Sequence, residues 1–387
     1  MNVDVLPIRP LTGGPKYHWF GYYDKLQFDP SGRYLLGMEV GFEHRSPTPE
    51  DEIGVGMVDL QEGNRWIPLG RSRAWCWQQG CMLQWRPGFE SEVMWNDRQG
   101  DRFVSHILDV RTGARRTLPH PFYALSPDGR TAVAPDFGRV NDLRPGYGYA
   151  GVPDAHADEL APEGSGVYRI DLDTGEQERI VSLASVAAIP NPHFDMREGK
   201  HYFNHLLFNP DGTRFIFLHR WRIGQGRRGR MFTAAPDGSD LRVIDDYGGI
   251  SHFIWRDPTH ILGWAPRPSH GGAFYLYEDG SSEIEAVGPG IMAVDGHCTY
   301  LPGNKWILND AYPDAERRRE LYVYEVATGI KVTLGRLLSP LPYDGEWRCD
   351  LHPRCSPDGR LIVIDSVHEG KGRQMYAIDI SGQAFGP

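Results

Sequence analysis

The sequence repeats one short phrase seven times along its 387 residues. Each copy has an apolar residue, a turn rich in Pro, Asp or Gly, and a second apolar run, which is the pattern of two strands joined by a tight turn. The clear copies are Phe28-Asp-Pro-Ser-Gly, Leu125-Ser-Pro-Asp-Gly, Phe208-Asn-Pro-Asp-Gly and Cys355-Ser-Pro-Asp-Gly, and the degenerate ones are Trp85-Arg-Pro-Gly, Trp255-Arg-Asp-Pro and Tyr300-Leu-Pro-Gly. Such a repeat constrains the fold more than length does, since this length alone would suggest two or three domains.

A second strand-turn-strand phrase follows each copy, as in Ile107-Leu-Asp-Val-Arg-Thr-Gly. Four strands per unit, at a spacing of roughly 40 to 55 residues, are typical of propeller blades. We therefore predict an all-β, seven-bladed β-propeller of four-stranded antiparallel blades, with a single domain over residues 1–387. The last unit lacks its fourth strand while Val3–Ile8 is an unassigned strand-like run, so we expect the N-terminal strand to close the ring and remove an exposed edge.

Composition and the N-terminal residues exclude several classes of protein. No apolar run approaches the roughly 18 residues that span a bilayer. A net charge of -10 argues against a nucleic-acid partner, which would need a basic surface. The N-terminal residues show neither the basic nor the apolar region of a secretory signal, and the five cysteines form no C-x-x-C pair, so we expect a cytoplasmic protein with reduced thiols.

The register of the repeat predicts which side chains meet at the centre of the ring. The first strand of each propeller blade lines the central channel, so equivalent positions in different blades converge. Counting back from each turn places the following residues there: Lys25, Cys81, Phe122, His205, His252, His297 and His352. Blades four to seven would thus each contribute a histidine to one site, although histidines that only line the channel are the simpler alternative.

These histidines suggest a metal site. Asp350 lies two residues before His352, so on one strand both side chains point to the same face. His297, Asp350 and His352, with His205 as a further candidate, make a mixed nitrogen and oxygen set that suits Mn, Ca, Zn or Fe rather than a thiolate site. We expect a divalent ion, with Mn before Ca or Zn.

Basic and aromatic residues of the nearby loops suggest an anionic ligand. Arg220 and Arg222 lie in blade four, and Arg144 lies in a long interruption of the repeat, residues 135–166. Arginine suits carboxylates because of its planar donor fork. Loops as long as this one are usually functional or disordered. The rigid and aromatic residues of this loop favour an ordered conformation. We take Tyr147, Tyr149, Gln78 and Gln79, with Trp75, as candidate sugar contacts.

The sequence of blades four to seven resembles that of the oligogalacturonate lyases. These are cytoplasmic seven-bladed propellers that cleave pectic fragments by β-elimination with a divalent metal. The resemblance covers roughly the C-terminal half and rests on Asn204-His205-Leu-Leu-Phe-Asn-Pro-Asp-Gly, Gly229-Arg230-Met-Phe, Ser251-His252-Phe, Gly296-His297-Cys and Asp350-Leu-His352-Pro. It implies His252 as the base, Arg230 as the group that assists at the substrate carboxylate, and His297 and His352 as metal ligands. Asp350 stands where that family has a histidine.

The N-terminal His18-Trp-Phe-Gly-Tyr-Tyr-Asp-Lys25 and the Arg144–Tyr149 segment look more like propeller lyases of ulvan or rhamnose-glucuronate polymers. The sequence therefore predicts a lyase for uronic-acid oligosaccharides that leaves a 4,5-unsaturated uronate, with an acidic oligosaccharide as its partner. The alternatives are a non-catalytic propeller that binds an acidic glycan or a protein, and a metal-dependent hydrolase.

Overall fold

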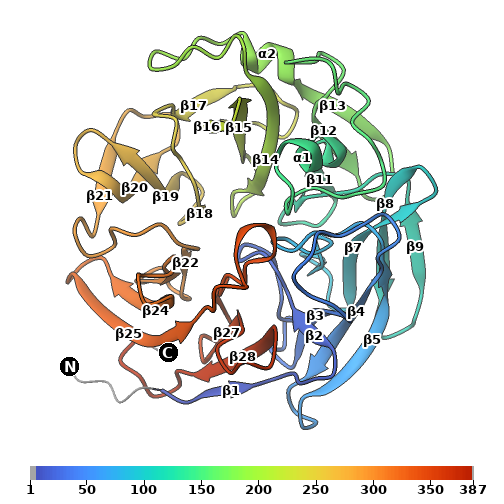
Figure 1. Cartoon of the computed structure of the whole chain (residues 1–387), viewed down its shortest axis with the longest axis vertical. Coiled ribbons are helices and arrows are strands. Elements are labelled where there is room, and N and C mark those ends of the chain that lie inside the picture. The colour runs from blue at the N-terminus through green and yellow to red at the C-terminus, as the bar shows by residue number, and fades with distance from the viewer. Residues whose placement is uncertain (1–5, 386–387) are drawn as a thin grey trace.

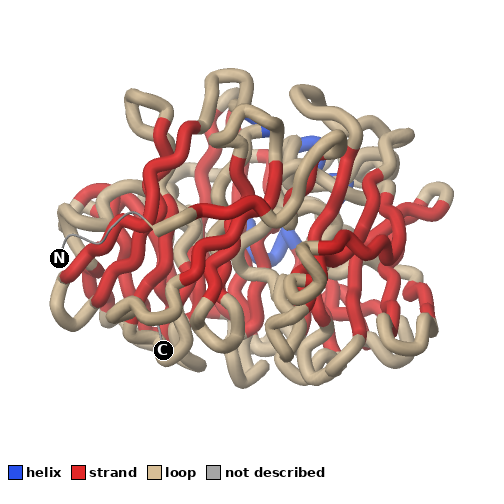
Figure 2. Tube along the Cα trace, turned by 90° about the horizontal axis from the view of Figure 1, so that it is seen from below, coloured by secondary structure: helices blue, strands red, loops and turns tan. Residues whose placement is uncertain are grey.

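Residues 6–385, which the computed structural model describes, form seven four-stranded antiparallel sheets arranged in a ring. Figure 1 looks along the axis of the ring and shows the sheets standing around it as blades. Figure 2 shows from the side that turns and loops cover both faces of the ring. The predicted seven-bladed β-propeller is confirmed.

The first six blades follow the chain in order, from the innermost to the outermost strand. Blades one to three consist of β2 (Tyr17–Trp19), β3 (Tyr34–Val40), β4 (Ile53–Asp59) and β5 (Arg65–Ser72); β6 (Gln84–Trp85), β7 (Glu92–Gln99), β8 (Arg102–Asp109) and β9 (Arg115–Leu118); and β10 (Ala124–Leu125), β11 (Thr131–Ala134), β12 (Gly166–Asp171) and β13 (Gln177–Ser182). Blades four to six consist of β14 (Lys200–Phe208), β15 (Phe215–Ile223), β16 (Gly226–Ala234) and β17 (Arg242–Asp245); β18 (Phe253–Trp255), β19 (His260–Arg267), β20 (Gly271–Glu278) and β21 (Ile284–Val287); and β22 (Thr299–Tyr300), β23 (Trp306–Asp310), β24 (Arg318–Glu325) and β25 (Ile330–Leu338).

The seventh blade closes the ring with both ends of the chain. It consists of β26 (Arg354–Cys355), β27 (Leu361–Ser366), β28 (Gln374–Asp379) and the N-terminal β1 (Ile8–Pro10). Ile8 pairs with Ile378 and Pro10 with Tyr376, so β1 is the missing edge strand, as predicted. Residues 3–5 of the predicted Val3–Ile8 run lie outside the described residues, and of residues 6–8 only Ile8 belongs to the strand.

The repeated turns explain why the blades form where they do. The glycines of the four clear copies, Gly32, Gly129, Gly212 and Gly359, have φ angles of +71°, +66°, +75° and +74°. An L side chain rarely adopts this left-handed conformation, whereas glycine does so at little cost. The glycine at a fixed place in each phrase therefore reverses the chain between the first two strands of a blade.

Between the blades, apolar side chains from neighbouring sheets form the core. In blade four, Phe217 and Phe232 stack with ring centroids 5.4 Å apart, and both belong to a buried cluster that reaches into blades two and three. Burying a side chain of this size contributes roughly 1.5–3 kcal/mol to stability. Within residues 6–385, the structure has no helix both long and apolar enough to cross a membrane.

The interruption of blade three is ordered, as expected, but it contains a helix that the sequence reading did not predict. Helix α1 (Phe137–Leu143) begins at Asp136, whose side chain accepts a hydrogen bond from the Arg139 backbone. Arg139 is buried and donates to Asp154 and to four backbone carbonyls, including that of His201 in β14. This arginine fixes the insertion to blade four, beside the centre of the ring (Figure 1). The other helical segments are α2 (Leu183–Ala187) and η1 (Gly345–Trp347).

Candidate functional site

The four predicted histidines lie together at the centre of the ring, and each is 1–3% exposed. The ring centroids of His252 and His352 each lie 4.2 Å from that of His297. Tyr22, from the segment between β2 and β3, lies among all four, with its ring centroid 4.8 Å from that of His205 and 5.4 Å from that of His352. The register of the repeat therefore located this group of imidazoles correctly.

His297, Asp350 and His352 form the tightest part of the group. One possible ligand atom of each lies within 4.8 Å of those of the other two. Asp310 accepts a hydrogen bond from His297 Nδ1 at 2.9 Å, which leaves Nε2 as the atom available to a ligand. Nε2 of His297 and Nε2 of His352 are both buried without a hydrogen-bond partner. Two such nitrogens beside a carboxylate fit a divalent metal ion.

Two arginines hold the carboxylate of this group. Arg348 Nε donates to Asp350 Oδ2 at 2.7 Å, and Arg319 Nη2 lies 2.6 Å from Asp350 Oδ1. Burial opposes ionisation of Asp350, but these two cations more than offset it and hold its pKa well below the usual range. Asp350 is therefore ionised, and its orientation is fixed by both arginines.

His205 does not belong to the metal group. Its Nε2 lies 3.2 Å from Asp24 Oδ2 and its Nδ1 lies 3.5 Å from the Tyr22 hydroxyl, so both ring nitrogens already have partners. The backbone of His205 has a φ of +50°, and the pairing of β14 with β15 is irregular between Asn204 and Leu207. This bulge turns the imidazole toward Asp24, which corrects the prediction of His205 as a ligand.

His252 is paired with a carboxylate that the sequence reading missed. Its Nδ1 lies 2.9 Å from Asp295 Oδ1. Burial lowers the pKa of His252 more than Asp295 raises it, so the imidazole is neutral near pH 7. A neutral imidazole oriented by a carboxylate can accept a proton through its other nitrogen.

Arg230 corrects another prediction, because its guanidinium group does not face the centre. Its donors are directed to His219 Nδ1 at 3.1 Å and to carbonyl oxygens of α2 and the following loop, Val186 at 2.8 Å, Ile189 at 2.9 Å and Pro190 at 3.3 Å. The neighbouring His219 in turn contacts His201 at 2.7 Å. Arg230 is completely buried and binds α2 to blade four, so its donors are not available to a substrate.

Tyr147 lies between two arginines. Arg348 Nη2 donates to the Tyr147 hydroxyl at 2.6 Å, and the guanidinium carbon of Arg144 lies 4.1 Å from the centre of the Tyr147 ring. Burial alone would raise the pKa of Tyr147, but Arg348 and Arg144 lower it to about 8. Tyr147 is thus an acid with a pKa near physiological pH, and it is linked to Asp350 through Arg348.

The other predicted binding residues divide into two sets. Arg220 faces the insertion that carries Arg144, whereas Arg222 is held in the hairpin turn by Gly224 O at 3.0 Å. Tyr149, Gln78, Gln79 and Trp75 are buried and have structural partners: Asn96 and Phe137 for Tyr149, the carbonyls of Glu346 and Arg348 for Gln78, Tyr123 for Gln79, and Trp19 and Trp77 for Trp75. The predicted sugar contacts of this second set are therefore not supported.

Several residues of the site were not predicted, although the sequence pattern could have identified some of them. Asp295 precedes His297 by two residues and Arg348 precedes Asp350 by two, so the alternation that identified Asp350 could have identified them. Tyr22 and Asp24 lie in the N-terminal motif His18–Lys25. Asp310 had no local signal, since it lies in β23, thirteen residues after its partner His297.

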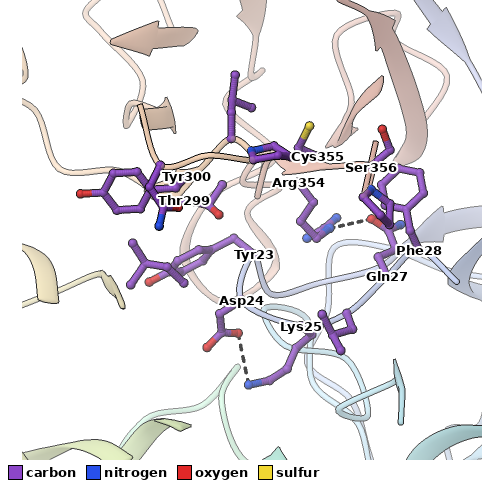
Figure 3. A pocket seen from close by; sticks show the side chains of 16 residues that line it. Tyr23, Asp24, Lys25, Gln27, Phe28, Thr299, Tyr300, Arg354, Cys355 and Ser356 are labelled. Carbon is purple, nitrogen blue, oxygen red and sulfur yellow. Dashed lines mark hydrogen bonds and ion pairs between the residues drawn. The ribbon is translucent and has the colours of Figure 1, made fainter. Parts of the chain in front are cut away.

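Two cavities lie among the repeated turns, on the side of the Tyr23–Lys25 segment that faces away from the histidines. One of about 430 Å³ is lined by Tyr23, Asp24 and Lys25 together with residues of blades six and seven, and Figure 3 shows its lining. Another of about 310 Å³ also contacts Asp24 and Lys25, whose Nζ lies 3.2 Å from Asp24 Oδ1. Because Asp24 also contacts His205, the Tyr23–Lys25 segment stands between the histidines and these cavities.

No protein-family model matches the sequence, and no curated protein matches it. Solved structures do share its fold. An oligogalacturonate lyase from Vibrio parahaemolyticus superposes with a TM-score of 0.69 at 15% identity, over 98% of this chain and 95% of that one. An oligogalacturonate lyase in complex with manganese gives 0.70 at 16% identity, over 97% and 93%.

The tricorn protease also superposes, with a TM-score of 0.54 at 11% identity, over 98% of this chain and 34% of that one. The same architecture therefore occurs in proteins with different chemistry. At these identities, what the chain shares with all three structures is the β-propeller fold.

Proposed function

We propose that this protein is a lyase that cleaves uronic-acid oligosaccharides by β-elimination and leaves a 4,5-unsaturated uronate. The observation that carries the proposal is the His252–Asp295 pair, since the His252 ring lies 4.2 Å from that of His297 in the group suited to a metal. Removal of a proton next to a carboxylate needs a base close to a cation. The full-length likeness to two oligogalacturonate lyases adds support from the fold.

A divalent metal ion would be held by His297, Asp350 and His352. When bound, it would act as a Lewis acid on the uronate carboxylate and make the C5 proton more acidic. We propose Mn first and Zn second, because two nitrogen donors and one carboxylate fit Ca poorly; that ion prefers about six to eight oxygen ligands. A manganese complex of a lyase with this fold supports the order.

The residues of the chain supply both proton transfers. His252 would take the C5 proton, and Asp295 would stabilise the imidazolium that forms. As the C4–C5 double bond forms and the C4–O bond breaks, the leaving oxygen needs a proton. Tyr147 is the proposed donor, because Arg348 and Arg144 would stabilise the phenolate left behind.

The direct test is incubation of the metal-loaded protein with a panel of uronate oligomers, followed by the near-ultraviolet absorbance of the unsaturated product. Replacement H252A should lower turnover by about 10²–10⁴-fold and leave the metal content, measured by mass spectrometry, unchanged. His260 pairs with Asp257 on the same blade, away from the centre, so H260A is a matched control. Loss of the metal from H252A would contradict the assignment of His252 as the base.

Other products would identify the alternative functions. New reducing ends without the unsaturated chromophore would indicate a metal-dependent hydrolase, and glycan binding without any product would indicate a binding module. The single domain over residues 1–387 and the cytoplasmic location are also proposals. Limited proteolysis and fractionation of the producing cells test them.

A further inference from the structure

Arg144 and Arg220 differ from the other arginines near the centre of the ring. Neither has an ion-pair partner within residues 6–385, and Nε of each is buried without a hydrogen-bond acceptor. Burial first, and next the charge of Arg144, lower the pKa of Arg220 to about 10. Two cations therefore lie near one another without an anion between them.

A third donor lies in the same place. Tyr202 stands directly opposite Arg220 in the pairing of β14 with β15, and its completely buried hydroxyl also has no partner. The Tyr202 ring packs in one cluster with Val140, Leu143 and Tyr147 of the insertion that carries Arg144. Donors from blade four and from the insertion thus meet, and within residues 6–385 the two Nε atoms and the Tyr202 hydroxyl have no acceptor.

A structural arginine of the same chain has different surroundings. Arg139, in the same insertion, is 1% exposed, and it has Asp154 at 2.7 Å and four carbonyl oxygens as acceptors, whereas Arg144 and Arg220 are partly buried and each has a buried Nε without an acceptor. Buried polar atoms in proteins are normally hydrogen-bonded, because an unpartnered one loses its hydration without compensation. The missing acceptor at Arg144 and Arg220 therefore points to a ligand.

The backbone of blade four makes room for one of these side chains. A Cβ atom placed on Gly229 would lie 2.6 Å from Arg220 Cδ and 2.9 Å from Arg220 Nη1. Gly229 pairs with Arg220 across β15 and β16, and its φ is not left-handed, so an alanine would fit the backbone. The three atoms nearest to its Cβ would all belong to Arg220. Gly229 thus positions Arg220.

We propose that Arg144, Arg220 and Tyr202 bind a second oxyanion of the substrate, a carboxylate or a sulfate ester on a sugar next to the one that reacts. The link to a glycan rests on the proposed function, whereas anion binding itself does not. The site is distinct from the metal group, since Tyr147 and Tyr22 lie between them: Arg144 covers Tyr147, Tyr147 lies 6.5 Å from Tyr22, and Tyr22 lies 5.4 Å from His352.

The first test uses inorganic sulfate as the probe, titrated into the metal-loaded, full-length protein in a calorimeter. The wild type should bind one sulfate, and R220Q and G229A should each weaken binding at least tenfold. The matched control is R228Q, since within residues 6–385 Arg228 also lacks an acidic partner, but its guanidinium group lies 4.0 Å from the centre of the Phe194 ring. G229A keeps every donor, so it remains informative if R220Q does not fold. Absence of sulfate binding, or equal affinity in wild type and G229A, would overturn the site.

The second test measures turnover of unsulfated and sulfated uronate oligomers. G229A should raise KM at least tenfold for oligomers with two acidic groups and leave kcat unchanged, and the oligomer most affected identifies carboxylate or sulfate as the natural group. A fall in kcat without a change in KM would overturn the assignment, because the site would then hold the reacting carboxylate. Sulfate binding that depends on Gly229, in a protein that cleaves no uronate, would uphold the anion site and reject the lyase.

Discussion

Two pairs of arginines lie near the centre of this propeller, and they have opposite surroundings. Arg319 and Arg348, from blade six and the segment before blade seven, share Asp350 and hold it ionised beside two imidazoles. Arg144 and Arg220, from the insertion and blade four, have no ion-pair partner among residues 6–385, and Nε of each lacks an acceptor. The first pair orients a carboxylate that could bind a cation, and the second is suited to an anion. The same residue type therefore suits opposite kinds of ligand, depending on whether a carboxylate lies beside it.

Replacement of Asp350 should have the largest effect on the paired side. D350N leaves the buried Arg319 and the partly buried Arg348 without their anion. We therefore expect the metal-free protein to lose about 3–5 kcal/mol of unfolding free energy and the metal site to be lost. Urea denaturation and metal analysis measure these effects. The control is E178Q, which breaks an exposed pair with Arg169 and should cost about 1 kcal/mol or less. A D350N protein as stable as E178Q would contradict the role of the carboxylate in this pair.

A smaller effect is expected where an arginine is structural. R230Q leaves the carbonyls of Val186 and Ile189 without their donor, which should cost about 1–3 kcal/mol, while metal content and kcat remain those of the wild type. Thermal unfolding and turnover on uronate oligomers check both expectations. If turnover fell as it does in H252A, Arg230 would belong to the site after all.

The smallest effect is spectroscopic and concerns Tyr147, which lies between the two arginine pairs. Because Arg348 and Arg144 lower its pKa to about 8, one tyrosinate should appear near that pH. Turnover should fall as the pH rises through this value, since the proposed donor then lacks its proton. Ultraviolet titration of Y147F should lose this step. Y149F should keep it, because burial raises the pKa of Tyr149.

Features that depend on residues close in the sequence could be predicted from it, whereas features that depend on contacts between distant residues could not. The glycine turns and the period of the strands are local, so they predicted the blades, the closing strand and the four histidines. Arg230 and Arg220 both lie on long strands of blade four, and alternation alone does not say which face meets α2 and which meets α1. The bulge at His205 and the helix in the insertion also depend on packing against distant residues.

The sequence by itself determined a ring of seven repeated units with imidazoles at its centre, because each turn and each strand register is fixed within a few residues. Only the tertiary structure decided what each charged side chain meets. Asp310 reaches His297 from β23 of blade six, Tyr22 reaches the histidines of four blades, and Arg144 approaches Arg220 from an insertion in blade three. The interaction between two charged groups depends on their distance in space, and closure of the ring brings these distant segments together.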